Sequence, residues 1–303
     1  MEQFIALTGR NLKTYFRDKG AVFFSLLSMI IVICLMMFFL GDMSIDGVIG
    51  TLSEFPGRDA AEDAKNAELI VLTWTCAGIL SINAVTVTLG NYSVMIKDRV
   101  SGKLNSIYTA PVSRTTIAAS YIASAWLASV IICILTLFLT ELYCTSKGME
   151  WYSFQTHLQL LGMILVNSFA YAGLMYVLAI LAKTEGAWSG LGTIIGTLVG
   201  FLGGIYIPIG GLSDSVGAMM KCTPVIYGTA MFRSIMTEDI IEKTFAGLPR
   251  ELHTIYREEM GISLTVFDKN IGITEEWLLL LICGILFLIV GVCMLKYSKK
   301  TDR

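Results

Sequence analysis

Six apolar stretches, each about as long as a lipid bilayer is thick, constrain this chain more than any other feature. They cover residues 21–40, 69–90, 115–143, 158–182, 187–209 and 277–295. A helix rises about 1.5 Å per residue, so about 20 apolar residues match a hydrocarbon core about 30 Å thick. With 55% hydrophobic and 15% charged residues, the 303-residue chain is too apolar for a soluble domain. The sequence therefore predicts an all-α polytopic membrane protein with six transmembrane helices in a single domain, residues 1–303.

A basic segment, residues 97–114, separates the second and third apolar stretches. It reads KDRVSGKLNSIYTAPVSR and carries four basic residues against one acid. Short loops with this excess of lysine and arginine stay on the cytoplasmic side of a membrane. Gly102 marks a turn, and Pro111 disfavours helix at the residue before it. Between them, apolar side chains recur at helical spacing, at Leu104, Ile107 and Tyr108. The segment predicts a short surface helix that lies across the cytoplasmic ends of two spans.

Charge also places the outer segments and the two termini. Residues 1–20 are basic and amphipathic, which predicts an interfacial helix; an ordinary cytosolic flank of the first span is the alternative. Residues 41–68 are acidic and belong outside, and 59–68 should be helical where they lead into the second span. The C-terminal tail is basic, with Lys296, Lys299, Lys300 and Arg303. Both termini are therefore expected in the cytoplasm, beneath a bacterial plasma membrane.

Polar side chains within the spans have two interpretations that the sequence leaves equally open. The residues concerned are Thr73, Thr75, Asn83 and Asn167. They either form hydrogen bonds between helices or line a hydrated substrate path. Glu141, near the outer end of the third span, is expected to be an interfacial acid that reaches water; a buried coupling carboxylate is the alternative.

Glycines recur at every fourth position of the fifth span, at Gly192, Gly196, Gly200 and Gly204. This spacing places them on one stripe of a helix, where the absence of side chains lets another helix approach closely. The stripe predicts a packing face for a helix of the same chain or of a second chain.

Residues 210–274 follow the fifth span and contain too many charges and prolines for another full crossing. Counting them as a span would also move the basic tail outside. The segment is therefore assigned to a re-entrant outer hairpin, marked by Pro208, Pro224 and Tyr227, and to an outer insert. The insert should hold a helix of about three turns that starts near Pro249. Thr274 is expected to cap the last span.

Nothing in the sequence forms a catalytic or metal-binding constellation. His157 and His253 lie far apart in outer segments, which leaves little for a metal site or a triad. The single Gly-Lys, at Gly102, lacks the remaining residues of a phosphate-binding loop. The span centres carry no charge, which disfavours a proton- or sodium-coupled carrier. Nucleic acid is not an implied partner.

The seven cysteines form no C-x-x-C pair, and most lie inside apolar stretches where a small hydrophobic residue fits. Cys144 and Cys222 differ because both are expected on the outer side. A disulfide between these two is an open alternative.

Two patterns in the chain resemble a known family. The first is carried by Asp98, Arg99, Gly102, Leu104, Ile107, Pro111, Ser113 and Arg114. The second is a glycine pair before Tyr206-x-Pro208, followed by Thr-Pro-x-x-Tyr at 223–227. They resemble the coupling segment and the outer hairpin of ATP-binding-cassette type 2 (ABC-2 type) permeases, whose cytoplasmic helix docks on a separate ATPase. The family has an acid directly after the Gly-x-Leu step, where this chain has Asn105.

The resemblance implies a permease subunit of an ATP-driven exporter of an amphipathic, drug-like, peptide or lipid substrate, as in multidrug efflux. ATP and Mg²⁺ would bind to the partner ATPase, and this chain would bind no cofactor and have no catalytic residue. Leu104, Ile107 and Tyr108 would fill a cleft on the ATPase. Polar contacts would come from Asp98, Arg99 and Arg114. The other implied partners are membrane lipid and, at the fifth span, a second permease copy or a paralogue. A membrane-embedded assembly or sensory protein and a sodium-exporting permease remain alternatives.

Overall fold

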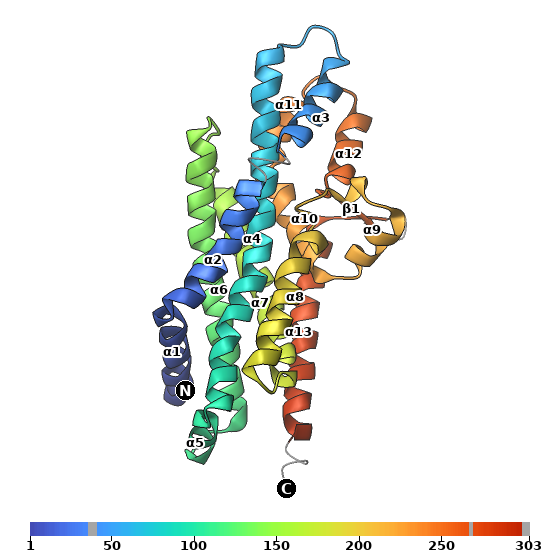
Figure 1. The fold of residues 1–303 in the computed structure, drawn as a ribbon. Coiled ribbons are helices and arrows are strands. Elements are labelled where there is room, and N and C mark those ends of the chain that lie inside the picture. Colours follow the sequence, from blue (N-terminus) through green and yellow to red (C-terminus); the bar gives the residue numbers. More distant parts are fainter. Residues whose placement is uncertain (36–40, 267–268, 299–303) are drawn as a thin grey trace.

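The computed structural model describes residues 1–35, 41–266 and 269–298, and most of them are helical (Figure 1). The long helices are α2 (Lys19–Leu35), α4 (Ala60–Val100), α6 (Arg114–Ser146), α7 (Phe154–Leu181), α8 (Glu185–Leu202) and α13 (Ile273–Ser298). The shorter ones are α1 (Glu2–Arg17), α3 (Gly41–Ser53), α5 (Lys103–Thr109), η2 (Ile209–Gly211), α9 (Asp214–Lys221), α10 (Pro224–Met236), α11 (Glu238–Thr244) and α12 (Arg250–Glu259). An antiparallel hairpin joins β1 (Leu264–Val266) to β2 (Lys269–Ile271). The prediction of an all-α membrane protein is confirmed, with this small hairpin as an addition.

Four helices in the described part of the chain are long and apolar enough to cross a membrane. They are α4, α6, α7 and the part of α13 from Ile273 to Met294. The six-span count stays a prediction, because α2 and α8 are not among the four and residues 36–40 of the first expected span lie outside the described residues. Helix α8 ends at Leu202 rather than at residue 209. The reason is Gly204, whose φ of 62° lies in the left-handed region and turns the chain.

Helix α4 is the centre of the bundle, with α6, α7, α8 and α10 packed around it (Figure 1). Asp59 caps its N-terminus, and the carboxylate accepts a hydrogen bond of 2.9 Å from the backbone N–H of Ala61. The expected helix at 59–68 therefore does continue into the second apolar stretch. At its other end α4 extends past residue 90 as far as Val100.

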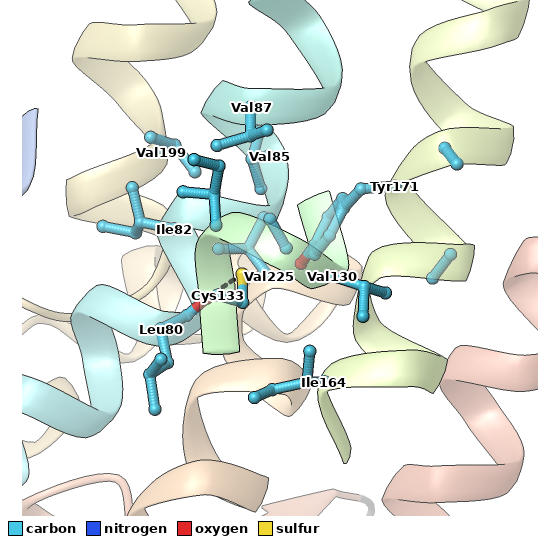
Figure 2. Packing of buried hydrophobic residues seen from close by; sticks show 14 of the residues in the cluster. Leu80, Ile82, Val85, Val87, Val130, Cys133, Ile164, Tyr171, Val199 and Val225 are labelled. Carbon is cyan, nitrogen blue, oxygen red and sulfur yellow. Dashed lines mark hydrogen bonds between the residues drawn. The ribbon is translucent and has the colours of Figure 1, made fainter. Parts of the chain in front are cut away.

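The core lies where five helices meet (Figure 2). The labelled side chains are Leu80, Ile82, Val85 and Val87 of α4, Val130 and Cys133 of α6, Ile164 and Tyr171 of α7, Val199 of α8 and Val225 of α10. The Cys133 thiol donates to the carbonyl oxygen of Leu80 at 3.7 Å. Helix α10 is thus embedded in the bundle although it follows the segment that the sequence assigns to a hairpin. Its re-entrant path through a membrane stays a prediction.

Helices α7 and α13 cross with their backbones in close contact. A Cβ atom added to Gly173 would lie 2.9 Å from the carbonyl oxygen of Gly284, and one added to Gly284 would lie 3.2 Å from the Cα atom of Ala170. These two glycines make the crossing close, and they are not part of the stripe that the sequence singled out.

Helix α1, helix α5 and the C-terminal end of α13 lie at one end of the molecule, and α3, α11 and α12 lie at the other (Figure 1). We refer to these as the inner and outer ends. Helix α1 packs along α6 and α4 and buries Thr8, Asn11 and Tyr15. Of the basic tail, residues 299–303 lie outside the described residues, as does the side chain of Lys296.

One expectation about the outer end is wrong, and one alternative left open there is excluded. Glu141 does not reach water: its side chain is 2% exposed and accepts 2.9 Å hydrogen bonds from the Tyr152 backbone N–H and from Nε2 of His157. The disulfide that the sequence left open is not formed, because Cys144 and Cys222 are both free; the sulfur of Cys144 lies 4.0 Å from that of Cys76.

Three further elements at the outer end compare with the sequence analysis as follows: one helix is as predicted, one helix start differs, and one helix was not predicted. The helix expected near Pro249 is present as α12. The predicted cap is wrong: helix α13 begins at Ile273, so Thr274 lies inside its first turn, and Glu275 accepts a 3.1 Å hydrogen bond from the Gly272 backbone N–H. The acidic segment 41–68 contains a helix, α3, that the sequence analysis did not predict.

Candidate functional site

The basic segment that the sequence singled out lies at the inner end and belongs to three elements. Residues 97–100 form the last turn of α4, α5 follows, and Arg114 begins α6. Gly102 takes a φ of 76° at the turn between α4 and α5, a conformation that glycine adopts without a steric penalty. Ala110 is extended before Pro111 and ends α5. The short helix forms where the sequence predicts it.

The apolar face of α5 is turned toward the chain's own bundle. Leu104 is 7% exposed and belongs to the hydrophobic core, and Ile107 and Tyr108 are half-buried against the same core. The guanidinium of Arg114 lies over the Tyr108 ring, 4.9 Å from its centroid. The side of α5 that remains exposed carries Lys103, Asn105, Ser106 and Thr109. The expectation that Leu104 fills a cleft on a partner is therefore corrected, because its side chain is already covered.

Asp98 forms a buried ion pair with helix α1. Its side chain is 5% exposed, and the guanidinium of Arg10 binds both carboxylate oxygens, with 2.8 Å between Nη2 and Oδ1. The Tyr121 hydroxyl donates to Oδ2 at 2.6 Å. The hydrogen bond with Asp98 raises the pKa of Arg10 above its usual value. We call Arg10, Asp98 and Tyr121 the inner clasp. Bidentate, charge-assisted hydrogen bonds of this kind are the strong ones in proteins.

The inner clasp continues into α6. Nη1 of Arg10 also donates to Oδ1 of Asn11 at 3.0 Å, and Nδ2 of Asn11 donates to Oγ of Ser120 at 3.4 Å. One network therefore connects α1, the end of α4 and the start of α6. Sequence reasoning missed Arg10 and Tyr121. The available signal was Asp98, the one acid in a strongly basic segment.

Arg99 holds the end of α7. Its Nη1 donates to the carbonyl oxygens of Ala182 at 2.6 Å, Ala179 at 3.1 Å and Ile180 at 3.4 Å. The last carbonyl groups of a helix have no partner within the helix, so this guanidinium satisfies them and complements the negative end of the helix dipole. Nη1 of Arg99, like the carboxylate of Asp98, is therefore engaged within the chain.

The residues predicted for a substrate path are buried and hydrogen-bonded. The hydroxyls of Thr73 and Thr75 donate to carbonyl oxygens one helical turn earlier, each at 2.8 Å. Nδ2 of Asn83 donates to Oγ1 of Thr136 at 2.9 Å, and Nδ2 of Asn167 donates to the carbonyl oxygen of Ser81 at 3.5 Å. The structure therefore places these two asparagines in contacts between helices. A role in a path remains a prediction.

The four glycines of the predicted stripe do not share one packing face. A Cβ atom on Gly192 would lie 3.2 Å from Leu89 of α4, one on Gly200 would meet Tyr206, and one on Gly196 would have nothing within 4 Å. Gly204 lies beyond the end of α8. Gly192 therefore packs against a helix of the same chain, whereas Gly196 packs against nothing within it. A packing face for a second chain stays a prediction.

The predicted hairpin residues occupy the turns between short helices. Pro208 precedes η2, and Pro224 is the first residue of α10. The Tyr227 hydroxyl donates to the carbonyl oxygen of Lys221 at 2.8 Å, which closes the corner between α9 and α10.

The chain was compared with known protein families, and the match covers the basic segment and the bundle around it. A family model described as "ABC-2 type transporter" matches residues 2–237, which include the helices from α1 to α10 and the basic segment 97–114. None of the curated proteins matches the chain.

Proposed function

Because the chain belongs to the ABC-2 type transporter family, a family of membrane permease domains, we propose that it is the permease subunit of an ATP-driven exporter in a cell membrane. The observation that carries the proposal is α5, a short helix at the inner end with a polar side exposed and an apolar side fixed in the bundle. A separate ATPase subunit would dock on this exposed side and would bind ATP and Mg²⁺.

The contacts of α5 support a route by which movement of the ATPase reaches the bundle. Leu104 sits in the core, and Tyr108 lies beneath Arg114 at the start of α6. The inner clasp connects the end of α4 to α1. A displacement of α5 would therefore move α4, α6 and α1 together. Since a packed core is not continuously deformable, such a displacement favours a switch between two arrangements.

The proposed substrate is an amphipathic, drug-like, peptide or lipid compound. A cavity of about 920 Å³ at the outer end supports this class. Its lining includes the apolar side chains of Leu212, Leu264 and Leu279 and the acidic groups of Asp214 and Glu259. Ligand sites combine a mostly apolar lining with a few polar groups in this way.

Ser106→Trp tests the docking side of α5. Ser106 is exposed, so tryptophan should not disturb the fold, but its bulk would prevent close approach of the ATPase. We expect at least about 10-fold weaker binding of the ATPase subunit, equal to about 1.4 kcal/mol, and a matching loss of substrate-stimulated ATP hydrolysis. Co-purification and ATPase assays of the complex in lipid nanodiscs measure both effects.

Thr254→Trp is the matched control for Ser106→Trp. Thr254 is an exposed helical residue of α12 at the outer end, so its substitution should leave ATPase binding unchanged. Equal ATPase binding by the wild-type protein and Ser106→Trp would contradict docking on α5. It would favour the alternative that this is a membrane-embedded assembly or sensory protein.

A second copy or a paralogue is proposed to pack against α8. Apolar side chains remain exposed on this helix, among them Ile194 (60%), Leu198 (48%) and Phe201 (50%). Gly196→Leu should keep the single chain folded, because a Cβ atom there meets nothing within 4 Å. It should weaken dimerisation by at least about 10-fold, since a close helix contact does not tolerate the added side chain. Mass photometry in detergent measures the dimer fraction, with Gly50→Leu of α3, also free of contacts, as control. An unchanged dimer fraction would exclude Gly196 from the interface.

A further inference from the structure

A cavity of about 310 Å³ lies at the inner end, bordered by α4, α5, α6 and α7, and is open to the surface where Asn105, Arg114 and Lys183 are exposed. Its polar lining consists mainly of three cations and three tyrosines: Arg99, Arg114, Lys183, Tyr108, Tyr121 and Tyr176. No acidic residue lines it in the described part of the chain. The volume is at the lower end of the range of about 300–1,000 Å³ that is typical of small-ligand sites. We call this site the basic cavity.

The positive charge of the basic cavity is not balanced within the protein. Among the described residues, neither Arg114 nor Lys183 forms an ion pair; Arg114 only stacks on Tyr108. Arg99 binds backbone carbonyl oxygens through Nη1 alone. Asp98, the acid next to Arg99, is engaged by Arg10 and Tyr121. Glu185, two residues after Lys183, is exposed and forms no ion pair among the described residues. Like charges held this close repel one another, so a bound anion would stabilise the arrangement.

The surroundings of the basic cavity favour a lipid over a partner protein. Apolar side chains complete the lining, including Met95, Ile117 and Ile180, which suit the first carbons of a lipid rather than a hydrated side chain. The cavity lies between α5 and the bundle, whereas the exposed side of α5 carries Lys103 and Ser106. Basic pockets between membrane helices on the cytoplasmic side bind anionic headgroups, and the cytoplasmic leaflet is rich in such lipids.

We propose that the basic cavity binds the phosphate group of an anionic phospholipid of the inner leaflet. The guanidinium of Arg114 and the ammonium of Lys183 bind the phosphate oxygens, and the tyrosine rings line the headgroup. Bound there, the lipid would hold α5 against α4, α6 and α7. The inference rests on the membrane orientation of the proposed function but does not require the ATPase, so it can fail while ATPase docking on α5 holds.

The test compares the thermal unfolding midpoint of the purified chain in nanodiscs of phosphatidylcholine with and without phosphatidylglycerol. We expect phosphatidylglycerol to raise the midpoint of the wild-type protein by mass action. The double substitution Arg114→Gln with Lys183→Gln should weaken the apparent affinity for phosphatidylglycerol about 30-fold, or about fivefold for each cation. The control Lys13→Gln with Lys103→Gln removes the same charge from exposed positions at the same end and should keep the wild-type response.

Three results would overturn the proposal. The first uses inorganic phosphate as the probe, added to nanodiscs of phosphatidylcholine alone. If phosphate raises the unfolding midpoint as much as phosphatidylglycerol does, the basic cavity binds free phosphate rather than a lipid. An equal loss of response in the control pair would mean that the lipid recognises the basic end in general. Retention of the response in Arg114→Gln with Lys183→Gln would place the lipid elsewhere. Arg114→Lys with native Lys183 keeps both charges and should respond like the wild type, which separates lost binding from lost folding.

Discussion

Asp98→Ala is expected to lower the free energy of unfolding by about 3 kcal/mol. Removing one partner of a buried ion pair costs about 3–5 kcal/mol, because the other charge stays behind without compensation. The side chain of Arg10 is 35% exposed, so water recovers part of its solvation and the lower end of that range applies. The Tyr121 hydroxyl also loses its acceptor. Denaturant or thermal unfolding of the purified chain in a defined detergent measures the loss.

Lys97→Ala is the control next to it in the sequence. Lys97 also pairs with an acid, Asp18, at 3.0 Å, but the two side chains are 56% and 39% exposed. Exposed pairs contribute about 0–1 kcal/mol, so the expected loss is at least threefold smaller than at Asp98. A double-mutant cycle of Asp98→Asn and Arg10→Gln should give a coupling energy of at least about 1 kcal/mol. A coupling energy near zero would show that the clasp does not hold α1 to α4.

Substitution of Asp98 should also loosen the inner end locally, because the inner clasp holds α1 against the ends of α4 and α6. We expect α1 to separate from α4 and α6 while the spans stay folded, since most of the core residues that α4 contributes lie between Ile70 and Val87, away from Asp98. Protease cleavage within 1–20 should therefore increase in Asp98→Ala and remain slow in Lys97→Ala.

Most of the long helices could be predicted from the sequence, because each is determined by the residues of its own segment. A stretch of about 20 apolar residues identifies a membrane helix without reference to any other part of the chain. The ends of α5 were equally local, set by Gly102 and Pro111. Helix α10 was harder, because its charges and proline mark it as an outer segment, whereas its burial depends on α4, α7 and α13.

The orientation of α5 could not be predicted from its sequence. Helical periodicity places Leu104, Ile107 and Tyr108 on one side, but it does not identify what covers that side. The structure covers it with the chain's own core, so the partner is left with the polar side. The inner clasp could not be predicted from the sequence either, because Arg10 and Asp98 are 88 residues apart and no local pattern links them.

Another buried charged residue lies in the segment that the sequence analysis assigned to the outer hairpin and insert. Arg233 of α10 is 0% exposed, and its guanidinium lies 3.8 Å from the ring centroid of Trp74 on α4. Nη2 donates to the carbonyl oxygen of Gly204 at 2.9 Å, and Nη1 to that of Met260 at 3.3 Å. Trp74 donates to the same Met260 carbonyl at 2.8 Å. No carboxylate pairs with Arg233 in the described part of the chain, so the Trp74 ring and the two carbonyl oxygens compensate its charge.

Trp74→Ala should therefore be the most destabilising single change, with a loss of about 4 kcal/mol or more in the free energy of unfolding. Truncating a buried tryptophan costs about 3–5 kcal/mol through lost burial and the cavity left behind. Loss of the cation–π contact adds up to about 2 kcal/mol where the cation is desolvated. Unfolding of the purified chain under the conditions used for Asp98→Ala measures this loss.

Two further tryptophan variants separate these contributions. Trp74→Phe keeps an aromatic face for Arg233 and loses the hydrogen bond to Met260, so it should cost about 1–2 kcal/mol. Trp151→Ala removes a tryptophan that is 51% exposed and should cost less than about 1 kcal/mol. If Trp74→Ala were no more destabilising than Trp151→Ala, the ring would not be what allows Arg233 to stay charged inside the bundle. The connection between α4, α10 and the end of α12 would then have to come from the apolar contacts around it.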